Sequence, residues 1–526
     1  MRTIATMWMQ GRGMTDWSHW IVMPVVLPAL AAAALIMLRA RPRIQRMTSL
    51  AVCVALALLA AWLTSVAAQG GLHVYALGDW PAPFGIVLVL DRLAALMLLA
   101  TAVIALGSLL YALRGRDADG GHFHALFLFQ LMGINGAFLT GDLFNLFVFF
   151  EVLLIASYCL LLHGGRNGQL VPGLHYVAIN FTGSFLFLVG VSLLYAMTGT
   201  LNMADMAQKV AVAPDADAAL IRAGALLLLV VFAIKAALFP LYFWLPRAYG
   251  AAEAPVAALF AIMTKVGVYA ILRVGTLVFG PDAGVAAAVF DPWLLPAALL
   301  TVAMASFGVL AGQTLRTMAG YLNITSVGII CVGVGMFSPA AIGAALYYLL
   351  HSTLAIGLLF LLIDLIRRRR AEGDRIGRGT APAHHAVLGL LYFSVAIAAV
   401  GLPPLSGFLG KVMLLQAAQG HQFTAWIWAV VLANALLALV AMARAGSLVF
   451  WHVAPPGKEA PYPVARGLAA EAAPVILLLA CILALSAGAQ KAAAYTAATA
   501  DQLLQPGQYI SSVLRQGANA AAGAVR

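Results

Sequence analysis

The stretch LLLLVVFAIKAALFP, residues 226–240, places a lysine inside a membrane-like apolar run and a proline at its end. Apart from Lys235, every residue before Pro240 is apolar, as in a helix that crosses a bilayer. An ammonium group there costs roughly 2.5–3.5 kcal/mol on insertion scales, so it must face the protein interior. Pro240 cannot continue the helix, and it frees a backbone carbonyl four residues earlier. The stretch therefore predicts an interrupted transmembrane helix with a charge near the break.

The same composition runs through all 526 residues, of which 63% are hydrophobic and only 9% charged, against roughly 25% charged in soluble domains. Runs of about 20 apolar residues recur, and in lipid such runs must be helical. We therefore predict an all-α polytopic membrane protein with about fourteen transmembrane helices. The expected spans are residues 19–38, 48–68, 91–113, 122–140, 142–163, 173–197, 219–240, 254–276, 289–311, 317–337, 339–366, 385–415, 424–448 and 466–487.

Arginine residues concentrate in alternate loops of this arrangement. Nearly all of them follow odd-numbered spans, whereas the loops after even-numbered spans carry mostly aspartate. Basic loops mark the cytoplasmic side of a membrane, so we expect both termini on the outer side. The net charge of +11 thus reflects membrane orientation, and no nucleic-acid partner is predicted.

Motifs for a metal or a cofactor are missing from the sequence. There is no CxxC, no His/Cys cluster and no glycine-rich phosphate loop beside a strand, so no metal and no cofactor are predicted. The longest polar breaks are too short for a soluble catalytic domain, and we predict that the chain is not an enzyme. These breaks are residues 69–84, 198–218, 367–384 and 451–465. We expect the cysteines to be small apolar core residues. They are Cys53, Cys159, Cys331 and Cys481.

Three of the six lysines, Lys235, Lys265 and Lys411, fall deep within predicted spans, whereas arginine stays in loops or at span ends. Lysine changes its pKa readily on burial, but arginine remains protonated. Lysine is thus the residue of choice where a proton must come off. Glu151 is the one carboxylate in a comparable position. We predict that these four residues face the bundle interior and transfer protons.

Helix-breaking residues accompany two of these lysines. Pro240 follows Lys235, and the second break precedes Lys411. Its residues are Pro403, Pro404 and Gly407. Interrupted spans in two parts of a chain point to a transport site, because they expose polar backbone to water or ions.

Other polar residues in the spans are open to two interpretations. The histidine side chain ordinarily titrates near neutral pH, so His351 would relay protons, unless it is a satisfied core histidine. Thr264 and Ser184 would hold water, but helix–helix hydrogen bonding explains them equally well.

Charges at the span ends are expected to have structural roles. Asp142, where the fifth span starts, is expected to be a helix N-cap or an interface anchor. For the remaining ones snorkelling to the membrane surface is the default expectation. They are Asp91, Arg92, Arg273 and Asp364. Residues 490–514, after the last span, are expected either to lie along the membrane or a neighbouring subunit, or to form a loosely ordered tail.

Several stretches of the chain are similar to those of a known family. They resemble the D subunit of Mrp-type (Pha/Mnh) monovalent cation/proton antiporters, which is related to the antiporter-like membrane subunits of respiratory complex I. The matching stretches are TGDLFNLFVFFEVLLIASYCLLLHGG (140–165), GLHYVAINFTGS (173–184), TGTLNMADMA (198–207), FPLYFWLPRAYGAAEAPVAALFAIMTKVGVYAILR (239–273) and GLPPLSGFLGKVMLL (401–415).

The resemblance implies a fourteen-helix fold with two inverted five-helix repeats, spans 4–8 and 9–13, and broken helices at spans 7 and 12. The expected divisions are residues 1–113 (three N-terminal helices), 114–280 and 281–450 (the repeats), and 451–526 (the last span and the tail). The proton-carrying residues of the family fall on five positions of this sequence. They are Glu151, Lys235, Lys265, His351 and Lys411.

The function implied is proton translocation within a multisubunit Na⁺(K⁺)/H⁺ antiporter of a bacterial plasma membrane. Its partners would be membrane lipid and subunits of the A/B, C, E, F and G types. The alternative is a proton-pumping subunit of a complex I-like or hydrogenase redox complex. Some relatives carry a lysine about one turn after the histidine, where this chain has Ala355, Ile356 and Gly357. A relay of His351 and water would then have to bridge spans 8 and 12.

Overall fold

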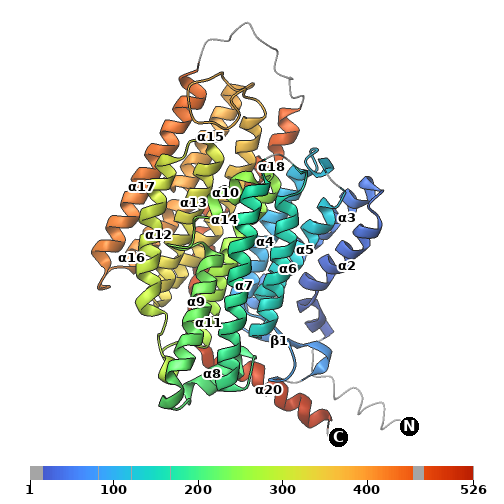
Figure 1. Ribbon diagram of the computed structural model, residues 1–526, viewed down its shortest axis with the longest axis vertical. Helices are drawn as coiled ribbons and strands as arrows, with labels where there is room; N and C mark the ends of the chain where they lie inside the picture. The colour runs from blue at the N-terminus through green and yellow to red at the C-terminus, as the bar shows by residue number, and fades with distance from the viewer. Residues whose placement is uncertain (1–15, 81, 120, 166–167, 454–466, 525–526) are drawn as a thin grey trace.

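Helices account for almost all of the regular secondary structure in a computed structural model, which describes residues 16–80, 82–119, 121–165, 168–453 and 467–524. Long helices lie side by side as a bundle, with short elements at its two ends (Figure 1). The long uninterrupted helices are α2 (Met23–Met37), α3 (Pro42–Ala67), α4 (Arg92–Ala112), α5 (Phe123–Leu139), α6 (Leu143–Leu161), α7 (Leu170–Thr198), α11 (Ala254–Leu277), α12 (Asp291–Ala311), α13 (Leu315–Gly335), α14 (Pro339–Arg367), α17 (Thr424–Gly446) and α18 (Leu468–Ala487).

Two further spans are interrupted helices. Helix α9 (Ala218–Ala236) ends just after Lys235, and the chain turns through Pro240 before α10 (Leu245–Ala251) begins. Helix α15 (His385–Val400) is separated in the same way from α16 (Ser406–Ala417) by a turn that contains Pro403 and Pro404. The predicted breaks at spans 7 and 12 are therefore confirmed.

The predicted spans correspond to helices throughout. Within the described residues, 11 helices are long and apolar enough to cross a membrane, and three shorter apolar helices complete the set. Each of the fourteen expected spans falls on one helix or on one interrupted pair. The apolar run length was sufficient for this prediction because a bilayer fixes the length of a helix that crosses it.

The arginine-bearing loops meet at one end of the bundle, as the alternation of charges requires. Ion pairs join these loops and the helix ends beside them. They are Arg46–Asp117, Arg116–Asp364, Arg116–Glu253 and Arg316–Asp374. Burial alone would raise the pKa of Asp117, but hydrogen bonds from His124 and Arg46 outweigh it and hold the pKa below its ordinary value. The basic loop residues Arg166, Lys458 and Arg466 lie outside the described residues.

The opposite end of the bundle carries small elements that the sequence did not predict. Strands β1 (His73–Ala76) and β2 (Val87–Leu90) pair antiparallel, and α8 (Met203–Ala211) lies nearby. The tail forms α19 (Ala489–Leu503) and α20 (Pro506–Ala524). Helix α19 packs on α14 and α4, and α20 crosses this end beside α8 (Figure 1). The expectation of a loosely ordered tail for residues 490–514 was therefore wrong, because the segment is helical and packs on its own chain. Its position along the membrane or a neighbouring subunit stays a prediction.

Helices α11 and α14 form the centre of the molecule. Every residue of α11 is buried, and so is nearly all of α14. These two helices carry Lys265 and His351, whereas α9 and α16 carry Lys235 and Lys411 against them. The most enclosed part of the bundle thus contains the rare charged residues of the spans.

Candidate functional site

The three central lysines are buried in the bundle, as predicted, and so is His351, but Glu151 is only half-buried. Exposed fractions are 7% for Lys235, 0% for Lys265, 2% for His351 and 6% for Lys411. Burying a charge without a partner is costly. The positions of these five groups therefore depend on the polar groups that each one contacts.

Lys235 contacts an asparagine on the neighbouring helix α7. Its Nζ lies 3.4 Å from Oδ1 and 3.5 Å from the backbone oxygen of Asn180, and 5.9 Å from the centre of the Phe150 ring. A cavity of about 20 Å³ lies beside the lysine, lined also by Tyr176 and Trp244. Water needs roughly 10–15 Å³ of such space, so the cavity is large enough for one molecule next to the ammonium.

Glu151 reaches Lys235 through α7. The Ser184 hydroxyl donates a hydrogen bond to the Glu151 carboxylate and lies 3.1 Å from the backbone oxygen of Asn180. Within the described residues Glu151 and Lys235 form no direct ion pair. The structure therefore shows the carboxylate and the ammonium apart, with one turn of α7 between them.

Lys265 is paired with a second asparagine. Its Nζ donates a hydrogen bond of 2.7 Å to Oδ1 of Asn323 on α13, and both residues are fully buried. The Asn323 Nδ2 and the hydroxyl of Thr264 are buried without a hydrogen-bond partner among the described residues. The polar surroundings of Lys265 are therefore neutral.

His351 faces the interrupted helix α15–α16. Its Nε2 lies 3.0 Å from the backbone oxygen of Ala398, and its Nδ1 lies 2.8 Å from Oγ of Ser406. A carbonyl only accepts, so Nε2 carries the hydrogen and Nδ1 accepts from the serine. Gly407 permits this approach, because a Cβ there would lie 2.4 Å from Nε2. Gly407 thus makes room for the ring within the first turn of α16.

Lys411 uses the backbone that the second break sets free. Its Nζ donates a 2.7 Å hydrogen bond to the carbonyl oxygen of Val400, the last residue of α15. The last carbonyls of a helix have no intrahelical partner, and the helix dipole makes them negative. The break at Pro403–Pro404 therefore supplies the oxygen that holds the ammonium.

The sequence predicted the charged and titratable groups described above, but most of their hydrogen-bond partners were missed. Asn180, Asn323 and Ser406 were not singled out, and Ser184 was left open between two interpretations. Asparagine inside an apolar span is the signal that could have found two of them, because a buried amide requires hydrogen-bond partners.

The snorkelling expectation was wrong for three of the four span-end charges. Asp91 and Arg273 are 2% and 3% exposed and form a two-point ion pair of 2.6 and 2.8 Å. The ring of Tyr509 on α20 covers the guanidinium at 5.2 Å. Only Arg92 reaches outward, to the carbonyl of Ala68. Membrane depth alone does not predict such pairs, because they depend on which helix ends meet.

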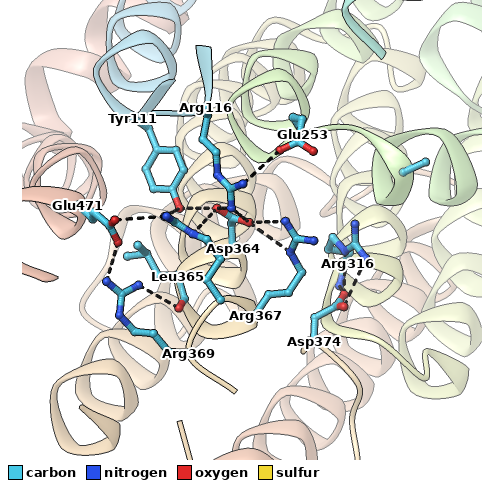
Figure 2. Close-up of polar contacts among 12 residues, drawn as sticks. Tyr111, Arg116, Glu253, Arg316, Asp364, Leu365, Arg367, Arg369, Asp374 and Glu471 are labelled. Carbon is cyan, nitrogen blue, oxygen red and sulfur yellow. Dashed lines mark hydrogen bonds and ion pairs between the residues drawn. The ribbon is translucent and has the colours of Figure 1, made fainter. Parts of the chain in front are cut away.

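Asp364 is the centre of a larger ionic cluster at the arginine-rich end of the bundle (Figure 2). Its carboxylate is 2% exposed and accepts hydrogen bonds from Tyr111, Arg116 and Arg367. Arg368 bridges it to Glu471, which also binds Arg369 at 2.5 Å. The cluster joins α4, α14 and α18 with the loop before α5.

The remaining predictions at single residues had mixed outcomes. Asp142 is the N-cap of α6, since its carboxylate accepts from the backbone nitrogen of Asn145. Cys53 and Cys331 are buried as expected, but Cys159 is exposed on the outer surface of the bundle. In the described part of the chain, no three His, Cys, Asp or Glu side chains are grouped so that they could hold a metal ion.

Comparison with known proteins places this chain in a family. A family profile described as "NADH:quinone oxidoreductase/Mrp antiporter, TM" matches residues 140–439. The D subunit of a probable K⁺/H⁺ antiporter of Rhizobium meliloti is 42% identical, over 95% of this chain and 98% of the relative. The D subunit of a Na⁺/H⁺ antiporter of Bacillus subtilis is 39% identical, over 95% of this chain and 100% of the relative.

Solved structures show the same fold. A chain of the Mrp complex from Dietzia sp. DQ12-45-1b superimposes with a TM-score of 0.85 at 28% identity, covering 95% of this chain and 100% of the other. A chain of an archaeal membrane-bound sulfane sulfur reductase gives 0.83 at 25% identity, covering 94% and 99%. The resemblance to Mrp-type antiporter subunits is thereby confirmed.

Proposed function

The chain belongs to the NADH:quinone oxidoreductase/Mrp antiporter transmembrane family, and from this premise we propose that it translocates protons within a multisubunit Na⁺(K⁺)/H⁺ antiporter. Both antiporter relatives described above are named as D subunits and match this chain over almost its full length. The chain is thus a transporter subunit, and its role is to couple proton movement to exchange of a monovalent cation.

The observation that carries the proposal is the row of buried lysines with neutral partners. Lys235 faces Asn180, Lys265 faces Asn323, and Lys411 faces the Val400 carbonyl. A carboxylate partner would keep each ammonium charged, whereas burial beside neutral oxygen leaves the free amine accessible. In the structural ion pairs at Asp364 and Asp91, by contrast, an arginine contacts a buried carboxylate.

In the proposed mechanism, Glu151 controls the charge of Lys235. Protons enter between α6 and α9, pass along Lys235, Lys265 and His351, and leave near Lys411. Approach of Glu151 stabilises the ammonium of Lys235, and withdrawal favours loss of its proton. Ser184 and Asn180 lie between the two groups and would transmit this change.

The proposed complex contains subunits of the A/B, C, E, F and G types in a bacterial plasma membrane. Because the relatives are named as single lettered subunits of an antiporter, their names support a multisubunit assembly. One relative is named for potassium and another for sodium, and we propose exchange of one of these ions. The positions of the arginine-rich loops support termini on the outer side.

A proton-pumping role in a redox complex is the second candidate. The fold is shared with a sulfane sulfur reductase chain and with a respiratory complex I chain, each at 25% identity. The antiporter subunits match at 39% and 42%. The higher identity over the same length favours the antiporter.

Cation-driven proton movement in everted vesicles tests the proposed function. The complete set of subunits is expressed in a host without its own antiporters, and sodium and potassium are added separately. We expect Glu151→Ala and Lys235→Ala to lower exchange about a hundredfold, as for removal of a proton-transfer group. Lys209→Ala is the matched control, because Lys209 is 43% exposed and pairs with Asp205 on its own helix.

Assembly of each variant is measured by size-exclusion chromatography before transport is compared. If both the Glu151 and the Lys235 variants assemble and exchange ions at the wild-type rate, the proposed function of this row is wrong. If the wild-type complex shows no exchange with either ion, the antiporter function itself fails.

A further inference from the structure

The proposed function needs a path for protons from Lys265 to the second interrupted helix, and His351 alone does not complete this path. Both ring nitrogens of His351 are engaged with α15–α16, at Ala398 and Ser406. The hydrogen bond that Lys265 makes is instead directed to α13. The polar group that contacts Lys265 from the expected second repeat is therefore Asn323.

The geometry of Asn323 leaves one half of its amide unused. An ammonium group only donates, so Oδ1 must face Lys265, at 2.7 Å. Nδ2 then points away from the lysine. It is fully buried and has no hydrogen-bond partner among the described residues. Native proteins leave few buried polar atoms unpaired, so this atom marks a position that a proton carrier or a water molecule would occupy.

An amide suits a lysine that gains and loses a proton. Its oxygen accepts from the ammonium, and its NH₂ group donates to the lone pair of the free amine after a half-turn about χ2. It carries no charge, so it does not hold the proton on the lysine as a carboxylate would. Asn180 contacts Lys235 through the same type of oxygen.

Polar groups continue from Asn323 toward His351. Ser326 lies three residues further along α13, on the same face of the helix. Its hydroxyl donates to the backbone oxygen of Leu322 and lies beside the Tyr348 phenol on α14. The Tyr348 ring lies 5.9 Å from the His351 ring. All of these residues are buried. Helix α13 thus carries buried polar side chains beside both Lys265 and Tyr348.

We propose that Asn323 is a positioning residue for Lys265 and that it directs proton transfer along Ser326 and Tyr348 toward His351. The inference rests on the proposed function and names the element, α13, that links the two halves of the path. It also explains how the path can dispense with the lysine that some relatives carry where this chain has Ala355, Ile356 and Gly357. In this chain, α13 supplies the polar group.

The test compares Asn323→Asp and Asn323→Leu in vesicles with the complete set of subunits. Aspartate keeps the shape and the acceptor but holds the proton on Lys265, and leucine removes both polar atoms. We expect each variant to assemble and to lower the maximal exchange rate roughly tenfold or more. Leucine removes a hydrogen bond to a charged group, and the aspartate charge opposes loss of the Lys265 proton. The cation concentration for half-maximal exchange should not change.

Thr325→Val is the matched control, because Thr325 is equally buried on α13 but bonds only to the carbonyl of Leu322 on its own helix. A purely structural hydrogen bond would survive in Asn323→Asp, so wild-type exchange by that variant overturns the inference. Lys265→Ala separates the two proposals. If it is inactive while both Asn323 variants are normal, only the role of Asn323 is wrong; if it is also normal, the proposed function fails.

Discussion

Neutral oxygen atoms face each of the three buried lysines, and this distinguishes them from the arginines of the same chain. Arg273 and Arg116 contact carboxylates that are 2% exposed. Arginine remains protonated in proteins, so a buried guanidinium requires a permanent counter-charge. A lysine beside an amide or a carbonyl is under no such constraint, which is why lysine occupies the proposed path and arginine occupies the ends of the bundle.

At the residue scale, Ser184→Ala tests how Glu151 communicates with Lys235. The serine hydroxyl donates to Glu151 and lies beside the Asn180 carbonyl. Alanine removes this link without filling space. We expect normal assembly and an exchange rate lowered by about tenfold, since a hydrogen bond to a charged group contributes roughly 1.5–3 kcal/mol.

The control is Thr182→Val on the same helix, where the hydroxyl is exposed and bonds only to Ala178 of its own helix. The measurement is exchange per assembled complex in everted vesicles. A Ser184→Ala complex as active as Thr182→Val would show that α7 does not carry the signal.

In the proposed path, the two interrupted helices bring polar backbone close to buried lysines. Their positions could be predicted, because Pro240 and Pro403–Pro404 stand out in apolar runs and a proline removes a helical hydrogen bond. The contacts made at the breaks could not. The Val400 carbonyl binds Lys411 only because α16 folds back beside the end of α15, and no spacing along the chain specifies that return.

The same limit applies to α7 and α13. Charges in apolar spans are rare, so Glu151, Lys235, Lys265 and Lys411 could be chosen from the sequence. Asn180 and Asn323 are polar but uncharged, and their importance appears only when neighbouring helices pack. The sequence therefore predicted the spans, the breaks and the central charges, whereas the hydrogen-bond partners required the packing.

At the element scale, Gly267→Ala tests the packing of α11 against the first break. A Cβ on Gly267 would lie 2.4 Å from the backbone nitrogen of Ala236 and 2.8 Å from the carbonyl carbon of Lys235. Backbone cannot yield as a side chain does, so the end of α9 must move. Overpacking of this kind costs about 1–3 kcal/mol, and we expect exchange to fall while the complex still assembles.

Gly250→Ala serves as the control, because its added Cβ would meet nothing closer than the Arg316 Cβ at 4.0 Å. Exchange rates and melting temperatures of both complexes are compared. Equal exchange rates in the two variants would mean that the contact between α11 and the end of α9 does not position Lys235.

At the scale of the whole molecule, the ionic cluster around Asp364 fixes the N-terminal helices and the last span to the central helix α14. Tyr111 comes from α4, Arg116 from the loop before α5, and Glu471 from α18 (Figure 2). No proton carrier of the proposed path belongs to it. The cluster therefore holds the bundle together at one end, apart from the lysines of the proposed path.

Asp364→Asn tests this division between structure and transport. The amide keeps the volume but removes the buried carboxylate that Arg116, Arg367 and Arg368 share, and loss of one partner of a buried ion pair costs roughly 3–5 kcal/mol. We expect a lower yield of assembled complex in mild detergent and a lower melting temperature. Asp374→Asn is the control, because Asp374 pairs with one arginine, Arg316, which is 31% exposed, so less charge is left uncompensated than at Asp364. Complexes of Asp364→Asn that do assemble should exchange ions normally. Normal stability with lost exchange would place Asp364 on the proton path and contradict the structural role.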